Sequence, residues 1–509
     1  MFAEGTRRSI VAEVFRNYIG GEWVDSTSGE TFESINPANA DEVIGVCQRS
    51  RKDDVVRAID AACAAFHSWS RTPAPTRSEI VLRVGLLLEE RKEEMARLET
   101  CEMGKVLEEG RGDVQEGIDM AKYIAGEGRR LFGETVPSEL RNKFAALLRQ
   151  PIGVVGLITP WNFPVAIPTW KLFPALVCGN TVVFKPAEET PTCATRLVQL
   201  FEEAGLPPGV LNLVTGYGPE AGAPIVEDER IRMISFTGSA GVGREIASRA
   251  GHSLKKCMLE LGGKNAMIVM DDANLDLALE GAVWGAFGTT GQRCTATSRI
   301  IMHEAVAGEF TRRLVDRAKQ LRVGPGLDAD TEVGPVINGQ QLETIHKYTE
   351  VGEGEGAKLL LGGKRLTGKR YDKGYFYAPT IFGNVNYRMR IAQEEIFGPT
   401  VALMPVSSYS EAITVANSTE YGLSSSIYTQ DINQAFQAIQ DLEAGITYVN
   451  APTIGAEIQL PFGGVKATGN GHREAGTSAV REFTEIKSVY VDYSGKLQRA
   501  QIDVEQPDT

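Results

Sequence analysis

The sequence predicts an α/β fold made of two successive α/β series, each with a mostly parallel sheet. The chain has 509 residues, too many for one core, because a domain commonly holds about 100–200 residues. After residue 150, short apolar runs alternate with helical stretches, as in strands that are covered by helices. Glycine is abundant, at 54 residues, and suits the many tight turns of such a fold.

The elements follow in order along the chain. Residues 53–127 are expected to be helical, because apolar residues recur there at three- and four-residue spacing. A later helix is marked by Thr190 as its N-cap, Pro191 at its first position and Gly205 beyond its end. Strands of the first series are expected at 154–159, 181–186, 209–216, 232–238 and 265–270, and those of the second series, which runs from about 271 to 450, at 300–304, 401–406 and 446–450.

Two strand candidates, at 147–151 and 485–493, lie outside both series. A strand placed so far from the main sheets pairs with something else, and another subunit is one option.

Composition narrows the class of protein. A net charge of −13 argues against broad binding to nucleic acids or anionic membranes. No signal-peptide-like run opens the chain, and the most apolar stretch, 152–170, is interrupted by glycine, proline and asparagine, so no membrane helix is expected. The seven cysteines are dispersed and never spaced as CxxC, which favours free thiols in the cytoplasm. The five histidines are scattered, so no metal site is expected.

Cys294, in FGTTGQRCTATSR, is the candidate nucleophile. A lone cysteine is usually a small buried apolar residue. Here a Gly-Thr-Thr-Gly run gives a permissive backbone, and neighbouring Arg293 is expected to favour the thiolate. A thiolate adds to an aldehyde, and loss of hydride from the hemithioacetal leaves a thioester that water can hydrolyse. Such a cysteine would suit the oxidation of an aldehyde to a carboxylic acid.

Two further residues suit this chemistry. Glu260, in LELGGKN, lies at the end of an expected strand, where α/β folds place their sites, and could activate the water. A surface glutamate is the alternative. Asn162, in TPWNFP, sits in a rigid turn between Trp161 and Phe163; it either stabilises the turn or donates its amide to the oxyanion.

A nicotinamide cofactor is suggested by FTGSAGVG (236–243), an expected strand followed by a glycine-rich helix start. The spacing GxxGxG is not the Rossmann fingerprint, but a helix N-terminus there could face a pyrophosphate, with Ser239 as a hydroxyl donor. Lys185 and Glu188, in VVFKPAEE, leave the end of another strand. A carboxylate at that place accepts from ribose hydroxyls and repels a 2′-phosphate, so NAD is expected and NADP is possible.

Together the segments NYIGGEWVDS, TPWNFP, KPAEET, FTGS, LELGGKN, GQRC, EEIFGP and PFGGVKATGNG resemble the aldehyde dehydrogenase superfamily, in family order from about residue 17 to 493. The resemblance implies Cys294 as nucleophile, Glu260 as general base, and Asn162 with the Cys294 backbone N–H as oxyanion hole. Cofactor contacts are implied for Pro160, Trp161, Lys185, Glu188, Gly238, Ser239, Glu395 and Phe397, with Glu395 on the nicotinamide ribose and Phe397 against the nicotinamide.

The resemblance also implies the domains. Residues 1–127 and 151–262 would form the NAD(P)-binding domain, 263–470 the catalytic domain, and 128–150 with 471–509 a β bridging segment for oligomerisation. A homodimer or homotetramer is expected, and the two outlying strands fit the bridge.

The aldehyde itself is less well defined. Arg293 would suit a substrate with a distal carboxylate, or it forms a salt bridge within the fold. The segment 450–464 resembles α-ketoglutaric semialdehyde (2,5-dioxopentanoate) dehydrogenases. The VQE at 114–116 resembles the α-aminoadipic semialdehyde enzymes, so Glu116, like Trp170, is a candidate substrate contact.

Several alternatives stay open: a succinic semialdehyde-type, broad-specificity or CoA-acylating enzyme, and a catalytically idle binding protein. Glu260 argues against CoA acylation, in which no water is activated. The idle protein is disfavoured by the presence of Cys294, Glu260 and Asn162 together.

Overall fold

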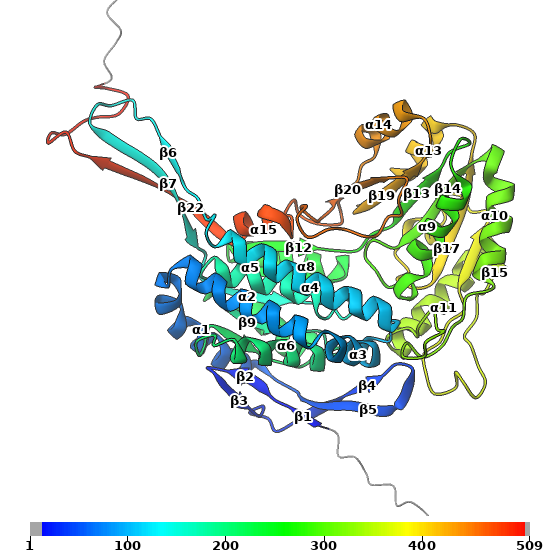
Figure 1. Cartoon of the computed structure of the whole chain (residues 1–509), viewed down its shortest axis with the longest axis horizontal. Coiled ribbons are helices and arrows are strands. Elements are labelled where there is room, and N and C mark those ends of the chain that lie inside the picture. The colour runs from blue at the N-terminus through cyan, green and yellow to red at the C-terminus, as the bar shows by residue number, and fades with distance from the viewer. Residues whose placement is uncertain (1–12, 504–509) are drawn as a thin grey trace, which may run out of the picture.

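A computed structural model describes residues 13–503. Two α/β units lie side by side, each around a seven-stranded sheet, and a narrow β arm projects away from the first unit (Figure 1). The predicted α/β class with two mostly parallel sheets is confirmed.

The first sheet carries five parallel strands and, at one edge, two antiparallel ones. In spatial order they are β12 (Lys256–Glu260), β11 (Ile231–Thr237), β8 (Val154–Ile158), β9 (Thr181–Lys185), β10 (Leu211–Leu213), β2 (Asn17–Ile19) and β3 (Glu22–Val24). The register aligns Ile158 with Lys185, and Thr237 with Glu260. Because parallel strands end at one edge of a sheet, the turns after β8, β9 and β11 come together there.

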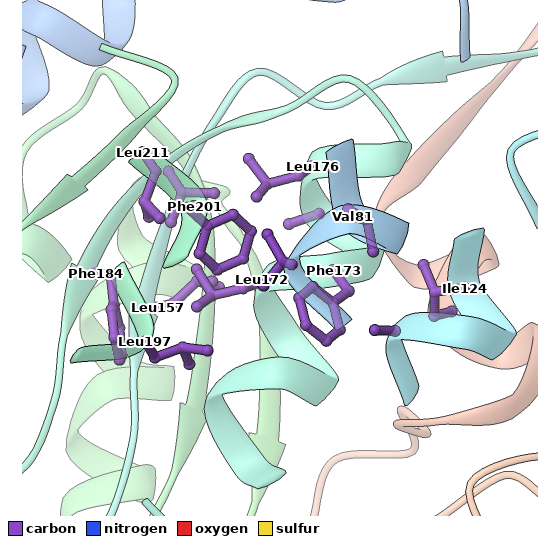
Figure 2. Packing of buried hydrophobic residues seen from close by; sticks show 14 of the residues in the cluster. Val81, Ile124, Leu157, Leu172, Phe173, Leu176, Phe184, Leu197, Phe201 and Leu211 are labelled. Atoms are coloured by element: carbon purple, nitrogen blue, oxygen red, sulfur yellow. The ribbon is translucent and has the colours of Figure 1, made fainter. Parts of the chain in front are cut away.

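Helices cover both faces of this sheet (Figure 1). They are α1 (Lys52–Arg71), α2 (Ala74–Glu90), α3 (Lys92–Met103), α4 (Leu107–Glu127), α5 (Ala166–Val177), α6 (Pro191–Glu203), α7 (Ala223–Glu227) and α8 (Ala240–His252). Figure 2 shows part of the core, where Phe173 of α5 meets Phe201 of α6 at 5.7 Å between ring centroids. Full burial of such a side chain contributes roughly 1.5–3 kcal/mol.

The helix that the sequence marked by Thr190 and Pro191 is α6, and Gly205 follows its end with a left-handed φ of 83°. Thr190 occupies the N-cap position, but its side chain makes no capping hydrogen bond. The buried Glu102 carboxylate of α3 accepts from the N–H groups of Thr192 and Cys193, at 2.8 and 2.9 Å, and so takes over that role.

The second sheet corrects one expectation. The strand at 265–270 was expected in the first series, but β13 (Asn265–Val269) pairs with β14 (Thr297–His303) and β19 (Ser424–Tyr428) in the second. The other strands of this sheet are β17 (Thr400–Val406), β16 (Thr380–Gly383), β15 (Lys358–Leu361) and β20 (Ile446–Val449). Its main helices are α9 (Leu275–Phe287), α10 (Glu304–Ala318), α11 (Gly339–Gly354), α13 (Tyr409–Ala416) and α14 (Ile432–Asp441).

The two outlying strands pair with each other. β7 (Lys143–Pro151) and β22 (Thr484–Asp492) form an antiparallel ladder along their whole length, with β6 (Glu134–Val136) on the far side of β7. The smaller elements are β1 (Glu13–Phe15), β4 (Thr31–Asn36), β5 (Asn39–Gln48), β18 (Tyr421–Gly422), β21 (Val465–Lys466), α12 (Arg390–Gln393) and α15 (Gly476–Glu482). Within residues 13–503, every helix is too short or too polar to cross a lipid bilayer.

Candidate active site

Two adjoining cavities form one groove at the carboxyl edge of the first sheet, and the smaller of them is also lined by the second unit. The larger, of about 690 Å³, is lined by Lys185 and Glu188, among others. The smaller, of about 280 Å³, is lined by Asn162, Cys294 and Glu395, among others. The cavities share Pro160, Trp161, Thr237, Gly238 and Ser239, so they form one groove in which distant parts of the chain meet.

The loop before Cys294 holds its backbone in an unusual shape. Thr289 and Thr290 have φ of 51° and 57°, the left-handed region that threonine rarely adopts. Such residues cost of order 1–3 kcal/mol each and persist only where the surroundings impose them. Glu109 of α4 accepts from the Thr289 N–H at 2.7 Å, and the Thr290 hydroxyl donates to the Gly334 carbonyl at 3.0 Å.

The glycines of LELGGKN allow other groups to approach this loop. A Cβ on Gly263 would lie 2.6 Å from the Cys294 carbonyl oxygen, and one on Gly262 would lie 2.2 Å from the Glu395 carboxylate. Asn265 completes the support, because its Nδ2 donates to the carbonyls of Cys294 and Ala296 at 2.8 and 2.9 Å. Sequence reasoning missed Asn265, although its place in the same motif as Glu260 was a usable signal.

Asn162 is buried, and its Nδ2 donates to the carbonyl of Gln292 at 3.1 Å. This contact brings the turn after β8 against the nucleophile loop, so the amide lies where it can serve Cys294.

Glu260, the last residue of β12, is buried rather than on the surface. Its two oxygens make no hydrogen bond to the described residues, and it packs against Gly463, where a Cβ would lie 2.5 Å from Oε1. Burial raises the pKa of the Glu260 carboxyl well above its ordinary value, and the nearby Glu474 acts in the same direction. The protonated form of the carboxyl is therefore favoured in this resting position.

The Cys294 thiol departs from expectation. Burial raises its pKa to about 12, and the carboxylates of Glu395 and Glu260 act in the same direction. Arg293 does not offset this, because its Nη2 is paired with Glu109 at 3.1 Å and its Nε donates to the Thr289 hydroxyl at 2.8 Å. The prediction that Arg293 favours the thiolate is therefore wrong for this state of the protein.

The residues suggested for the cofactor lie along the groove. Lys185 Nζ donates to Glu188 at 3.2 Å, and Ser239 is the N-cap of α8. Trp161 and Phe397 meet edge to face, 5.3 Å apart. Glu395 accepts from the Gly263 N–H at 3.0 Å, and burial raises the pKa of its carboxyl to about 7. An open helix N-terminus, ribose-binding carboxylates and an apolar aromatic end fit a dinucleotide.

The three candidate substrate contacts line neither cavity. Arg293 takes the salt-bridged position described above. Trp170 is buried edge to face with Phe462, at 5.0 Å between ring centroids. Glu116 is half-buried, and burial followed by the charge of Asp113 raises the pKa of its carboxyl to about 8.

Known proteins resemble the whole chain. The aldehyde dehydrogenase family matches residues 23–489. An alpha-ketoglutaric semialdehyde dehydrogenase of Bacillus subtilis is 44% identical, covering 95% of this chain and 99% of its own. Mouse retinaldehyde dehydrogenase 3 is 42% identical, covering 96% and 95%. A solved betaine aldehyde dehydrogenase of Staphylococcus aureus, in complex with NAD+, superposes with a TM-score of 0.93 at 38% identity, covering 95% of each chain.

The expected family and its NAD(P)-dependent oxidation of aldehydes are confirmed by these matches. The chain belongs to the aldehyde dehydrogenase family.

Proposed function

We propose that the chain oxidises a carboxylate-bearing semialdehyde, such as 2,5-dioxopentanoate, to the diacid with NAD, through a thioester on Cys294. The main support for this proposal is the groove, in which Cys294, Asn162 and Glu395 line the smaller cavity and the larger cavity offers room for a dinucleotide.

Cys294 acts as the nucleophile. Its sulfur adds to the aldehyde carbon, and the thiol proton must leave, since only the thiolate is reactive. The new oxyanion accepts hydrogen bonds from the Asn162 amide and the Cys294 backbone N–H. The contact of Asn162 with the Gln292 carbonyl fixes the distance between donor and nucleophile loop.

When bound, NAD supplies the hydride acceptor that turns the hemithioacetal into a thioester. On the protein side, Lys185 and Glu188 would hold the adenosine ribose, and Gly238 and Ser239 at the start of α8 would face the pyrophosphate. Glu395 would bind the second ribose, while Phe397, Pro160 and Trp161, which line the smaller cavity, would shield the nicotinamide end from water.

Glu260 then acts as general base for the hydrolysis. It must turn from its resting place beside Gly463 toward the thioester, where its carboxylate takes a proton from the attacking water. A buried carboxyl with a raised pKa matches that task, because its conjugate base is strong enough near neutral pH. Because Glu260 would activate water, the proposed reaction ends in hydrolysis of the thioester and not in transfer of the acyl group to CoA.

The substrate assignment is supported by the relatives named for alpha-ketoglutaric semialdehyde. Thr289 and Glu109 occupy the Nε–Nη2 edge of the Arg293 guanidinium. A distal carboxylate would reach Arg293 only if the guanidinium turned from Glu109 toward the smaller cavity, which it does not line in this structure. The two other relatives are named for retinaldehyde and betaine aldehyde, which carry no carboxylate, so the contrast between aldehydes with and without a carboxylate is informative.

We further propose the domain limits given above, and a homodimer or homotetramer in the cytoplasm. The arm, formed by β6, β7 and β22, exposes apolar side chains that a second subunit would cover. Among them are Phe144, Leu148, Ile486 and Tyr490. All seven cysteines are free, as suits a reducing compartment.

A panel of 2,5-dioxopentanoate, succinic semialdehyde, hexanal and betaine aldehyde, assayed with NAD and with NADP by NADH or NADPH absorbance, tests the proposal. The highest kcat/KM is expected for 2,5-dioxopentanoate with NAD. A higher kcat/KM for the neutral or cationic aldehydes would remove the substrate assignment, and a Cys294→Ala variant with substantial turnover would remove the mechanism.

A further inference from the structure

A lysine with no exposed surface lies between α3 and α4. Lys105 Nζ is 2.6 Å from Glu99 Oε1 and 2.9 Å from Asp113 Oδ2, and all three side chains are 0% exposed. Burial lowers the pKa of Lys105, but Asp113 and Glu99 outweigh this, so the group is an ammonium. A buried ion pair is weak evidence for stability, because apolar replacements are often as stable. The network therefore invites another explanation.

The ammonium lies against the oxyanion turn. Lys105 Nζ is 3.9 Å from the ring centroid of Phe163, which directly follows Asn162. The guanidinium of Arg293, which directly precedes Cys294, is 5.3 Å from the same centroid. Cations at these distances are attracted by the negative face of an aromatic ring, more strongly when water is excluded. One ring thus connects the turn that carries Asn162 with the loop that carries Cys294.

Asp113 holds the other end of the same turn. Its Oδ1 accepts from the N–H of Ala166, the first residue of α5, at 2.6 Å. The Lys105 network therefore contacts the segment around Asn162 twice, through the Phe163 ring and through the helix start.

The backbone of Lys105 lies close to the support of the nucleophile loop. Gly104 and Lys105 pack against Gly334 and Gly326, where a Cβ would come within 2.0 and 2.2 Å of their carbonyl oxygens. Gly334 is the residue whose carbonyl accepts from Thr290. Displacement of Lys105 would therefore reach both sides of the groove.

We propose that Lys105, together with Asp113, is a positioning residue that fixes the Asn162 amide relative to Cys294 through Phe163. The proposal rests on the proposed function, in which Asn162 donates to the oxyanion. Lys105 lines neither cavity, so its effect should appear in the chemical step.

The test uses Lys105→Met, Asp113→Asn and Phe163→Leu in the full-length enzyme. Asp113→Asn keeps an acceptor for Ala166 and serves if Lys105→Met does not fold. The control is Glu102→Gln, which alters an equally buried carboxylate that caps α6 and itself lines neither cavity. For each variant, kcat per titrated active site, KM for NAD, and alkylation of Cys294 by iodoacetamide are measured.

Lys105→Met and Asp113→Asn are expected to lower kcat about 10- to 100-fold, part of the loss seen when an oxyanion donor is removed. KM for NAD and the alkylation rate should stay within about twofold, since alkylation forms no oxyanion. The double variant Lys105→Met/Phe163→Leu should be no slower than the slower single variant.

Three results would overturn the proposal: kcat unchanged in both network variants, alkylation slowed as much as turnover, or additive losses in the double variant. A lower melting temperature with unchanged kinetics, as expected for Glu102→Gln, would mean that Lys105 only stabilises the fold. Cys294→Ala separates the two hypotheses, because substantial turnover in that variant contradicts the proposed function itself.

Discussion

Gly263→Ala should disable the nucleophile loop without touching the substrate. The added Cβ would lie 2.6 Å from the Cys294 carbonyl oxygen and 3.0 Å from Asn265 Oδ1, whereas ordinary contacts begin at 3.4 Å. The Cys294 carbonyl is held by Asn265 Nδ2 at 2.8 Å, so neither group can retreat alone. The loop must therefore shift by several tenths of an ångström.

A misplacement of roughly 1 Å can cost about 100-fold in rate, so kcat should fall by about 10- to 100-fold. That range corresponds to about 1.4–2.7 kcal/mol of lost transition-state stabilisation. KM for NAD should change less than kcat, because Lys185 and Glu188 lie in the other cavity and only Glu395, which accepts from the Gly263 N–H, adjoins the substitution.

The assay is steady-state NADH formation, with iodoacetamide alkylation of Cys294 as an independent measure of the loop. Gly308→Ala in α10 is the matched control, because no atom lies within 4 Å of its added Cβ. Its kcat should equal that of the wild type. If Gly263→Ala kept both kcat and alkylation within about twofold of wild type, the close approach would not govern the nucleophile.

Further predictions concern individual steps. Glu260→Gln should slow hydrolysis by about 10²- to 10⁴-fold and leave a pre-steady-state burst of NADH; equal loss of burst and turnover would contradict a role in hydrolysis. Because the pKa of Glu260 is raised and the base must be ionised, wild-type hydrolysis should rise with pH through that pKa, and a flat profile would refute this. Glu188→Gln should raise kcat/KM for NADP relative to NAD about tenfold, since a charge facing the 2′-phosphate is removed; an unchanged ratio would count against Glu188 as the discriminator. Arg293→Met should raise KM for 2,5-dioxopentanoate about tenfold and leave hexanal nearly unaffected, while equal losses would assign Arg293 to the loop.

The residues suggested from the sequence are those that motifs mark locally. Cys294 follows a glycine-rich run, Glu260 ends a strand, and Ser239 begins α8, so each position is visible in a short segment. The same local view placed the strand at 265–270 in the wrong series, because an apolar run does not reveal its neighbours in a sheet.

The sequence by itself determined the chemical groups, the α/β class and most strands and helices, since these depend on residue type and short-range periodicity. Only the tertiary structure decided which partners these groups have and how their pKa values are shifted. Glu109 meets Thr289 and Arg293 across 180 and more positions of chain, and this pairing holds the Arg293 guanidinium while burial and nearby carboxylates raise the pKa of the Cys294 thiol. Burial and Coulomb interactions depend on distances between segments that are far apart in the sequence. The raised pKa values of Cys294 and Glu260, and the position of Lys105 beside Phe163, therefore follow only from the tertiary structure.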